Sequence, residues 1–214
     1  KNLFLVTNYL NTKIKNVKVC TTTKNISKKF DKNIQIISDK FKNLEKINIR
    51  FRYLICLFTL FSFLKKNNNY VVLSFQANIY CVLICKLLNV DIVVRSNTSP
   101  EGWKHNFIKE IIYKRIITYA NVLLVNSLEF KKQVKKKYNV NVKCILNPLN
   151  TKQILQSLKL KKNNKNFYKK NNKSLKLINI GRLTDQKDQI TILKAINLLK
   201  NRMNFELLII GSGY

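Results

Sequence analysis

Two cationic side chains, Arg182 and Lys187, stand in the stretch NIGRLTDQKDQITILKA near the end of the chain. The apolar residues before them are typical of a strand, and the apolar periodicity after them predicts a helix capped by Thr184 or Asp185. A helix N-terminus carries free N–H groups and a partial positive charge, so two cations beside it predict an anion site, with phosphate as the obvious anion. The alternative is an exposed strand-to-helix turn, on which Arg and Lys are common.

Polar residues after another apolar segment form a second set of candidates, because ligands of open parallel sheets lie at the carboxyl ends of the strands. Arg95, Asn97 and Ser99 follow such a segment in a polar loop, which suits recognition of a hydroxyl or a phosphate. Alternatively, these residues cap the following helix. His105 beside Trp103 suits sugar binding or base chemistry, or it is a surface histidine beside an anchoring tryptophan.

Strands and helices are predicted to alternate along most of the chain. This alternation would position both sets of candidate site residues at the ends of strands. The segments YVVLSF, DIVVRS, VLLVNS and VKCIL indicate strands, and ANIYCVLICKLL, NFIKEIIYKRIITYA and LEFKKQVKKKY indicate the helices between them. Ser127 is well placed to cap the last of these helices. Shorter strands at VKVCTTT and NIQIIS, with helices over 2–10 and 44–66, precede them. The pattern predicts an α/β fold with doubly wound parallel sheets.

Two domains are expected. Residues 1–148 form a Rossmann-like domain that is incomplete at its start, and residues 149–173 form a linker that contains KKNNKNFYKKNNK, with almost nothing to bury. The alternation starts afresh in residues 174–214, the beginning of a second domain. The chain does not begin with methionine and it stops at GSGY, so we expect it to be a piece of a longer protein.

A formal net charge of +31 suggests nucleic acid or an anionic membrane as a partner. The lysines, however, accompany a surfeit of Asn, Ile, Phe and Tyr along the whole chain, as A+T-rich codons would produce. There is no arginine-rich groove pattern and no interleaved aromatic-basic motif, so no nucleic-acid partner is expected. Dense basic runs are interpreted as solvated surface, with a membrane-facing role as the alternative.

Five cysteines show no CxxC pair and lie among apolar neighbours, so they are expected to be buried, reduced thiols. Because the chain holds a single histidine, no histidine-based metal site is expected. The apolar run from Tyr53 to Leu64 is too short for a bilayer span, which needs about 20 residues. We therefore interpret that run as a buried helix.

The end of the chain resembles the nucleotide-sugar domain of the family 4 glycosyltransferases of GT-B fold. The resemblance lies in GRLTDQKD, with LKLINI before it and ELLIIGSG after it. In that family the arginine and lysine of this pattern grip the donor diphosphate, which implies this role for Arg182 and Lys187. Gly181, Gly211 and Gly213 resemble the family's turns near the bound nucleotide.

The middle of the chain resembles, in the same order, the later part of the family's acceptor-binding domain. The segments concerned are VVRSNTSP, VNS and ILNPLN. This implies acceptor contacts for Arg95, Asn97 and Ser99. The family's glycine-rich loop after its first strand and its later pair of glutamates are not found. The catalytic residues therefore remain unassigned, and this chain alone is expected to be inactive.

The resemblance implies transfer of a sugar from a nucleotide diphosphate sugar to a glycan or lipid-linked acceptor, with retention, in cell-surface polysaccharide synthesis. It implies no metal and no cofactor beyond the donor substrate, because positive side chains and helix dipoles neutralise the leaving diphosphate. A cytoplasmic location at the inner face of an anionic membrane is expected. The alternatives are a GT-B-fold nucleotide-sugar epimerase, which would need more histidines, and a basic α/β nucleic-acid-binding protein, which a salt titration would reveal.

Overall fold

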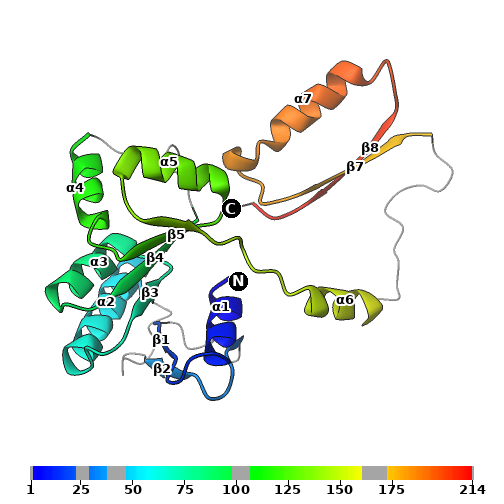
Figure 1. Cartoon of the computed structure of the whole chain (residues 1–214). Coiled ribbons are helices and arrows are strands. Elements are labelled where there is room, and N and C mark those ends of the chain that lie inside the picture. The colour runs from blue at the N-terminus through cyan, green and yellow to red at the C-terminus, as the bar shows by residue number, and fades with distance from the viewer. Residues whose placement is uncertain (1, 23–28, 38–46, 98–106, 161–172, 214) are drawn as a thin grey trace. The chain divides into compact units, whose positions relative to one another are not determined.

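The computed structural model describes residues 2–22, 29–37, 47–97, 107–160 and 173–213 (Figure 1). Within them the chain forms two compact units, residues 1–150 and 151–214, and each is described by itself. The expected division into 1–148, 149–173 and 174–214 stays a prediction. Residues 151–160 of the expected linker are helical in the structure.

The first unit is built around a four-stranded parallel sheet. Its strands are β3 (Val72–Ser74), β4 (Ile92–Ser96), β5 (Val122–Val125) and β6 (Val142–Cys144), in the order β3-β4-β5-β6. The helices between them are α3 (Asn78–Leu87), α4 (Phe107–Ile117) and α5 (Leu128–Tyr138). Because neighbouring strands follow one another in sequence, right-handed crossovers place these three helices on one face of the sheet. The predicted α/β class with a parallel sheet is confirmed.

The core of the first unit lies between that sheet and its helices. Val82 and Cys85 of α3, Val94 of β4 and Ile117 of α4 have no exposed surface. Alternate strand residues contribute to this core, among them Ile92 and Val94 of β4 and Leu123 and Val125 of β5. This packing fixes the carboxyl ends of β3 and β4, where the candidate site of this unit lies.

The start of the chain adds a smaller parallel pair, β1 (Lys18–Cys20) with β2 (Gln35–Ile37), and the helices α1 (Asn2–Asn11) and α2 (Ile49–Lys66). The expectation that α2 is a buried helix is wrong for most of its length. Leu64 is its only buried residue, whereas Phe51, Leu54 and Phe58 are more than 60% exposed. These three apolar side chains recur at helical spacing on the face turned away from the core.

Two further expectations concern membranes and thiols. Among the described residues, none of the helices is long and apolar enough to cross a bilayer.

All five cysteines are free, and only Cys81 and Cys85 are buried. Cys20, Cys56 and Cys144 are partly exposed, so the expectation of buried thiols is wrong for these three.

The second unit contains α6 (Thr151–Leu160), then β7 (Leu175–Ile180), the short 3-10 helix η4 (Asp185–Lys187), α7 (Gln189–Leu199) and β8 (Phe205–Ile210). Strands β7 and β8 are parallel over their whole length, so β7–α7–β8 is one βαβ unit. None of the described residues from 173 to 213 is buried. The apolar side chains of this βαβ unit therefore remain largely uncovered.

Candidate functional site

The loop after β7 carries the two cations that were predicted to form an anion site. Arg182 and Lys187 are both exposed. The structure places η4, whose last residue is Lys187, before α7, and α7 begins at Gln189. Its N-cap is Asp188, and the prediction of Thr184 or Asp185 as its cap is wrong. Thr184 instead caps η4, without a side-chain hydrogen bond.

Asp188 caps α7 through both of its carboxylate oxygens. Oδ1 accepts a hydrogen bond from the Thr191 backbone N–H at 3.3 Å, and Oδ2 accepts one from the Thr191 hydroxyl at 2.8 Å. Asp188 has a φ of 45°, a left-handed conformation that Asp tolerates better than most residues. The sharp turn at this residue ends η4 and starts α7.

The Lys187 side chain lies beside Gly181 at the end of β7. A Cβ at Gly181 would be 3.5 Å from Lys187 Cγ and 3.6 Å from Cδ. The Gln189 amide nitrogen donates a 2.9 Å hydrogen bond to the carbonyl oxygen of Arg182, which ties the start of α7 to the loop. Sequence reasoning missed Gln189, because a glutamine at a helix start carries no distinctive signal.

The turn after β8 lies directly against the turn after β7. A Cβ at Gly211 would overlap the carbonyl oxygen of Gly181, so only glycine fits there. The Gly181 N–H donates to Ile210 O at 3.0 Å, the Leu183 N–H donates to Ser212 O at 3.0 Å, and Leu183 forms a parallel bridge with Gly213. The structure therefore brings Gly181, Gly211 and Gly213 together with the loop that carries the cations.

The loop holds as many acidic as basic side chains, but the described structure shows no ion pair between them. Asp185 and Asp188 accompany Arg182 and Lys187, and the Asp188 carboxylate is engaged in capping α7. In the part of the chain that the structure describes, neither cation has an ion pair. The Thr184 hydroxyl oxygen is buried and lacks a hydrogen-bond partner there. Among the described residues, the loop thus presents two exposed cations that have no ion pair.

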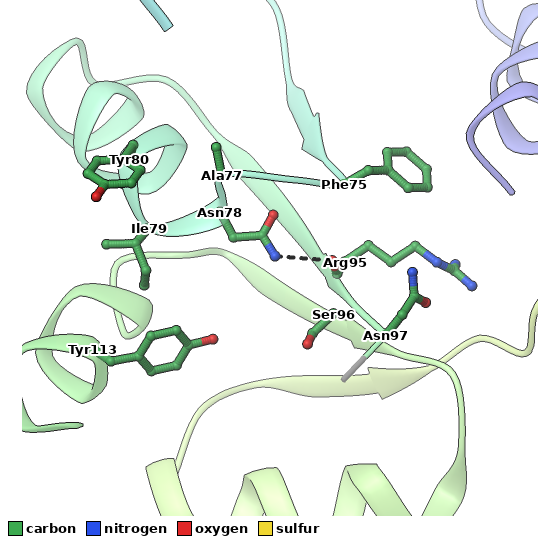
Figure 2. Close-up of a pocket in the computed structure, with 9 residues that line it drawn as sticks. All are labelled: Phe75, Ala77, Asn78, Ile79, Tyr80, Arg95, Ser96, Asn97 and Tyr113. Carbon is green, nitrogen blue, oxygen red and sulfur yellow. Dashed lines mark hydrogen bonds between the residues drawn. The ribbon is translucent and has the colours of Figure 1, made fainter. Parts of the chain in front are cut away.

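The first unit has a pocket of about 380 Å³ where β3 and β4 end and α3 begins (Figure 2). It is lined by Phe75, Ala77, Asn78, Ile79, Tyr80, Arg95, Ser96, Asn97 and Tyr113. The Ser74 hydroxyl donates to Asn78 Oδ1 at 2.7 Å, and Asn78 Nδ2 donates to the Arg95 carbonyl oxygen at 3.1 Å. These bonds fix the N-terminus of α3 against the end of β4.

Arg95 is buried, with 2% of its surface exposed. Its Nη2 donates to the backbone oxygen of Ile145 at 3.3 Å and to Asn147 Oδ1 at 3.0 Å, whereas its Nε is buried with no partner among the described residues. Burial lowers the pKa of Arg95 below its ordinary value. Burial likewise raises the pKa of Tyr113, which stays a neutral phenol across the physiological range.

Of the remaining candidates in the first unit, the structure describes only Asn97. Asn97 is exposed and lines the pocket with Arg95. Ser99, Trp103 and His105 lie outside the described residues. Sequence reasoning missed Asn78 and Tyr113, because both stand on helices whose pattern indicates only packing.

Ser127, which follows β5, was expected to cap the next helix. Ser127 is the N-cap of α5, and its Oγ accepts a 3.1 Å hydrogen bond from the Phe130 backbone N–H, so this prediction is confirmed. The side-chain oxygen of Asn126, one residue earlier, is buried and has no partner among the described residues.

No protein-family model matches this chain. The chain is similar to an uncharacterized glycosyltransferase, MJ1059, of Methanocaldococcus jannaschii, with 30% identity over 126 residues. The match covers 55% of this chain and 30% of the archaeal protein, so the chain spans less than a third of that relative's length.

Proposed function

We propose that this chain is part of a glycosyltransferase that takes its sugar from a nucleotide diphosphate sugar, with Arg182 and Lys187 holding the donor diphosphate. The observation that carries the proposal is the loop after β7, where two exposed cations without ion pairs in the described structure adjoin a glycine turn. Similarity to a protein named as a glycosyltransferase supports the same function.

The chemistry needs positive charge at this position. When a glycosyl bond breaks, the departing nucleoside diphosphate gains negative charge, and fixed cations and N–H dipoles stabilise that charge in the transition state. Arg182 offers a planar set of donors that suits two phosphate oxygens, and Lys187 offers a compact charge.

The finer assignment follows the resemblance to the family 4 enzymes of GT-B fold. It comprises retention at the anomeric carbon, no metal requirement, and a glycan or lipid-linked acceptor in cell-surface polysaccharide synthesis. The acceptor would bind the first unit through the polar residues after β4. The basic surface would let the protein work on the cytoplasmic side of an anionic membrane.

The test uses the full-length protein and titrations with uridine diphosphate and guanosine diphosphate. We expect Arg182→Ala and Lys187→Ala each to weaken binding of the preferred nucleotide about tenfold or more, because each removes a charge-assisted contact with the diphosphate. Lys194→Ala is the matched control, since Lys194 is an exposed lysine within α7. Unchanged affinity in both site variants, or equal loss in the control, would refute the assignment.

A further inference from the structure

The helix α2, which contacts α3 in the first unit (Figure 1), is apolar on two sides, and only one of them is covered. The side that faces the core is formed by Leu57, Leu60, Phe63 and Leu64. The other side carries Phe51, Leu54 and Phe58, which are spaced three and four residues apart and therefore share one face of the helix. We call these three residues the outer stripe.

The outer stripe is a continuous apolar surface that lies in water. Phe51, Leu54 and Phe58 are 61%, 62% and 68% exposed. Single apolar side chains on a surface are normal, but a helix that is apolar all round is usually covered on every side. Contiguous exposed apolar surface marks a place where a protein meets a partner or a membrane.

Cations stand at both ends of the outer stripe. Arg50 precedes Leu54 by four residues, and Lys65 follows Phe58 by seven, so both lie on the same face as the stripe. Both are exposed. The distance along the helix between the two positions is roughly 22 Å, at about 1.5 Å per residue. Between Glu45 and Asp91 the sequence has no acidic residue, so the helix itself carries no carboxylate that would balance these charges.

The charge decides between two ways of covering this surface. A second copy of the chain would bring the same cations and the same formal net charge of +31, and like charges keep such proteins apart. An anionic bilayer offers acyl chains to the apolar side chains and negative headgroups to the cations. Helices that lie in a bilayer surface combine Phe and Leu with flanking Lys and Arg in this way. Charge complementarity therefore favours the bilayer.

We propose that α2 docks the protein on an anionic bilayer, with Phe51, Leu54 and Phe58 among the upper acyl chains and Arg50 and Lys65 against the lipid phosphates. Because the opposite side of α2 packs on the core, the helix lies along the membrane surface. This inference deepens the membrane contact of the proposed function by naming the surface that makes it, and it rests on that function only for the lipid-linked acceptor met there.

The test measures co-sedimentation of the full-length protein with two kinds of vesicle. One kind is phosphatidylcholine alone, and the other is an equal mixture of phosphatidylcholine and phosphatidylglycerol. We expect binding to the anionic vesicles about tenfold or more tightly than to the neutral ones, because only the former attract the cations. Added salt should weaken the binding by screening. Absence of binding to the anionic vesicles would overturn the proposal.

Variants separate the outer stripe from the overall charge, which by itself attracts the protein to anionic vesicles. Leu54→Ser and Phe58→Ser should each lower the vesicle affinity about tenfold, because each removes apolar area from the bilayer. Leu128→Ser is the matched control and should leave the affinity unchanged. Leu128 is a leucine of α5 in the same unit, is 67% exposed, and adjoins the exposed Glu129.

Arg50→Gln tests the contribution of the flanking cations. We expect it to lower the affinity for the anionic vesicles about fivefold, because a cation near an anionic surface contributes about that factor. Its effect on binding to phosphatidylcholine should be small. All of these replacements are at exposed positions, so the variants should fold as the unmodified protein does.

The outcomes separate this proposal from its rivals. Unchanged vesicle affinity in both stripe variants would overturn it and leave only a general charge effect, and an equal loss in Leu128→Ser would do the same. A dimer in sedimentation velocity that Phe58→Ser dissociates would assign the outer stripe to a second copy instead. Nucleoside diphosphate binding is titrated in parallel. If no nucleotide binds while the vesicle results hold, the proposed function fails and the docking surface stands.

Discussion

The side chain of Lys187 packs over Gly181, with its Cγ 3.5 Å from the position that a Cβ would occupy there. The stem of this exposed lysine lies along the end of β7. A single methyl group at residue 181 would leave room for this stem, whereas a branched side chain would not.

Gly181→Val should therefore weaken nucleoside diphosphate binding several-fold, because the branched side chain would displace the Lys187 stem. Gly181→Ala is the matched control: its single methyl would make only an ordinary van der Waals contact, so affinity should stay near that of the unmodified protein. Titration with the preferred nucleotide measures both. Equal affinities for the two variants would show that the contact does not orient the lysine.

Gly211→Ala should destabilise the second unit, because its methyl group would overlap the Gly181 carbonyl oxygen and force the two turns apart. We expect a loss of about 1–3 kcal/mol or more in the free energy of unfolding, as for other overpacked sites. Gly213→Ala should cost less, because its Cβ would lie 3.4 Å from the nearest atoms of Leu183. Urea unfolding compares the two, and an equal loss would contradict the predicted difference.

Asp185→Asn should strengthen nucleoside diphosphate binding about twofold at low salt, because it removes a negative charge beside the two cations at an exposed site. The gain should shrink as salt is added and screening shortens the range of the interaction. Asp31→Asn, at an exposed position of the first unit, is the control. A gain that does not depend on salt would point to a different cause.

Cys56 should be alkylated at lower pH than an ordinary thiol. Its Sγ lies 3.8 Å from Cys20 Sγ, and a hydrogen bond from Cys20 lowers the pKa of Cys56 by stabilising its thiolate. A lowered pKa means that the thiolate is already populated at a lower pH, so the rate of reaction with iodoacetamide should rise there first. Mass spectrometry of the labelled peptides gives the pH profile.

Cys20→Ala supplies the control for this profile. Without the hydrogen bond, burial alone acts on Cys56 and opposes its ionisation. The inflection of the labelling rate should then move to higher pH. A profile that is the same in the presence and absence of Cys20 would contradict the assigned hydrogen bond.

Sequence pattern predicted the order of the strands and helices because each has a strong local signal. The continuous apolar runs that became β4 and β5 are typical of a sheet covered by helices, and Ser127 followed a simple capping rule. The cap of α7 was mispredicted because two acidic residues and a threonine competed for it, and η4 moved the helix start to Asp188.

Burial and side-chain bonding could not be predicted in the same way. An apolar run such as α2 predicts a helix, but its exposure depends on which other segments pack against it, and only Leu64 is buried. The bond from Arg95 Nη2 to Asn147 joins residues 52 positions apart, which no local pattern encodes. The loop residues were identified by type, and their contacts required the structure.

The contact between Gly181 and Gly211 has a mechanical consequence. Backbone hydrogen bonds join the turns after β7 and β8, and pairing continues past them to Leu183 and Gly213. These bonds couple the two turns, so they form a single rigid rim, made of the backbone of residues 181–183 and 211–213, at this edge of the βαβ unit. A ligand that meets this rim finds its backbone already ordered and loses little conformational entropy there, which leaves the Arg182 and Lys187 side chains as the parts that must adjust.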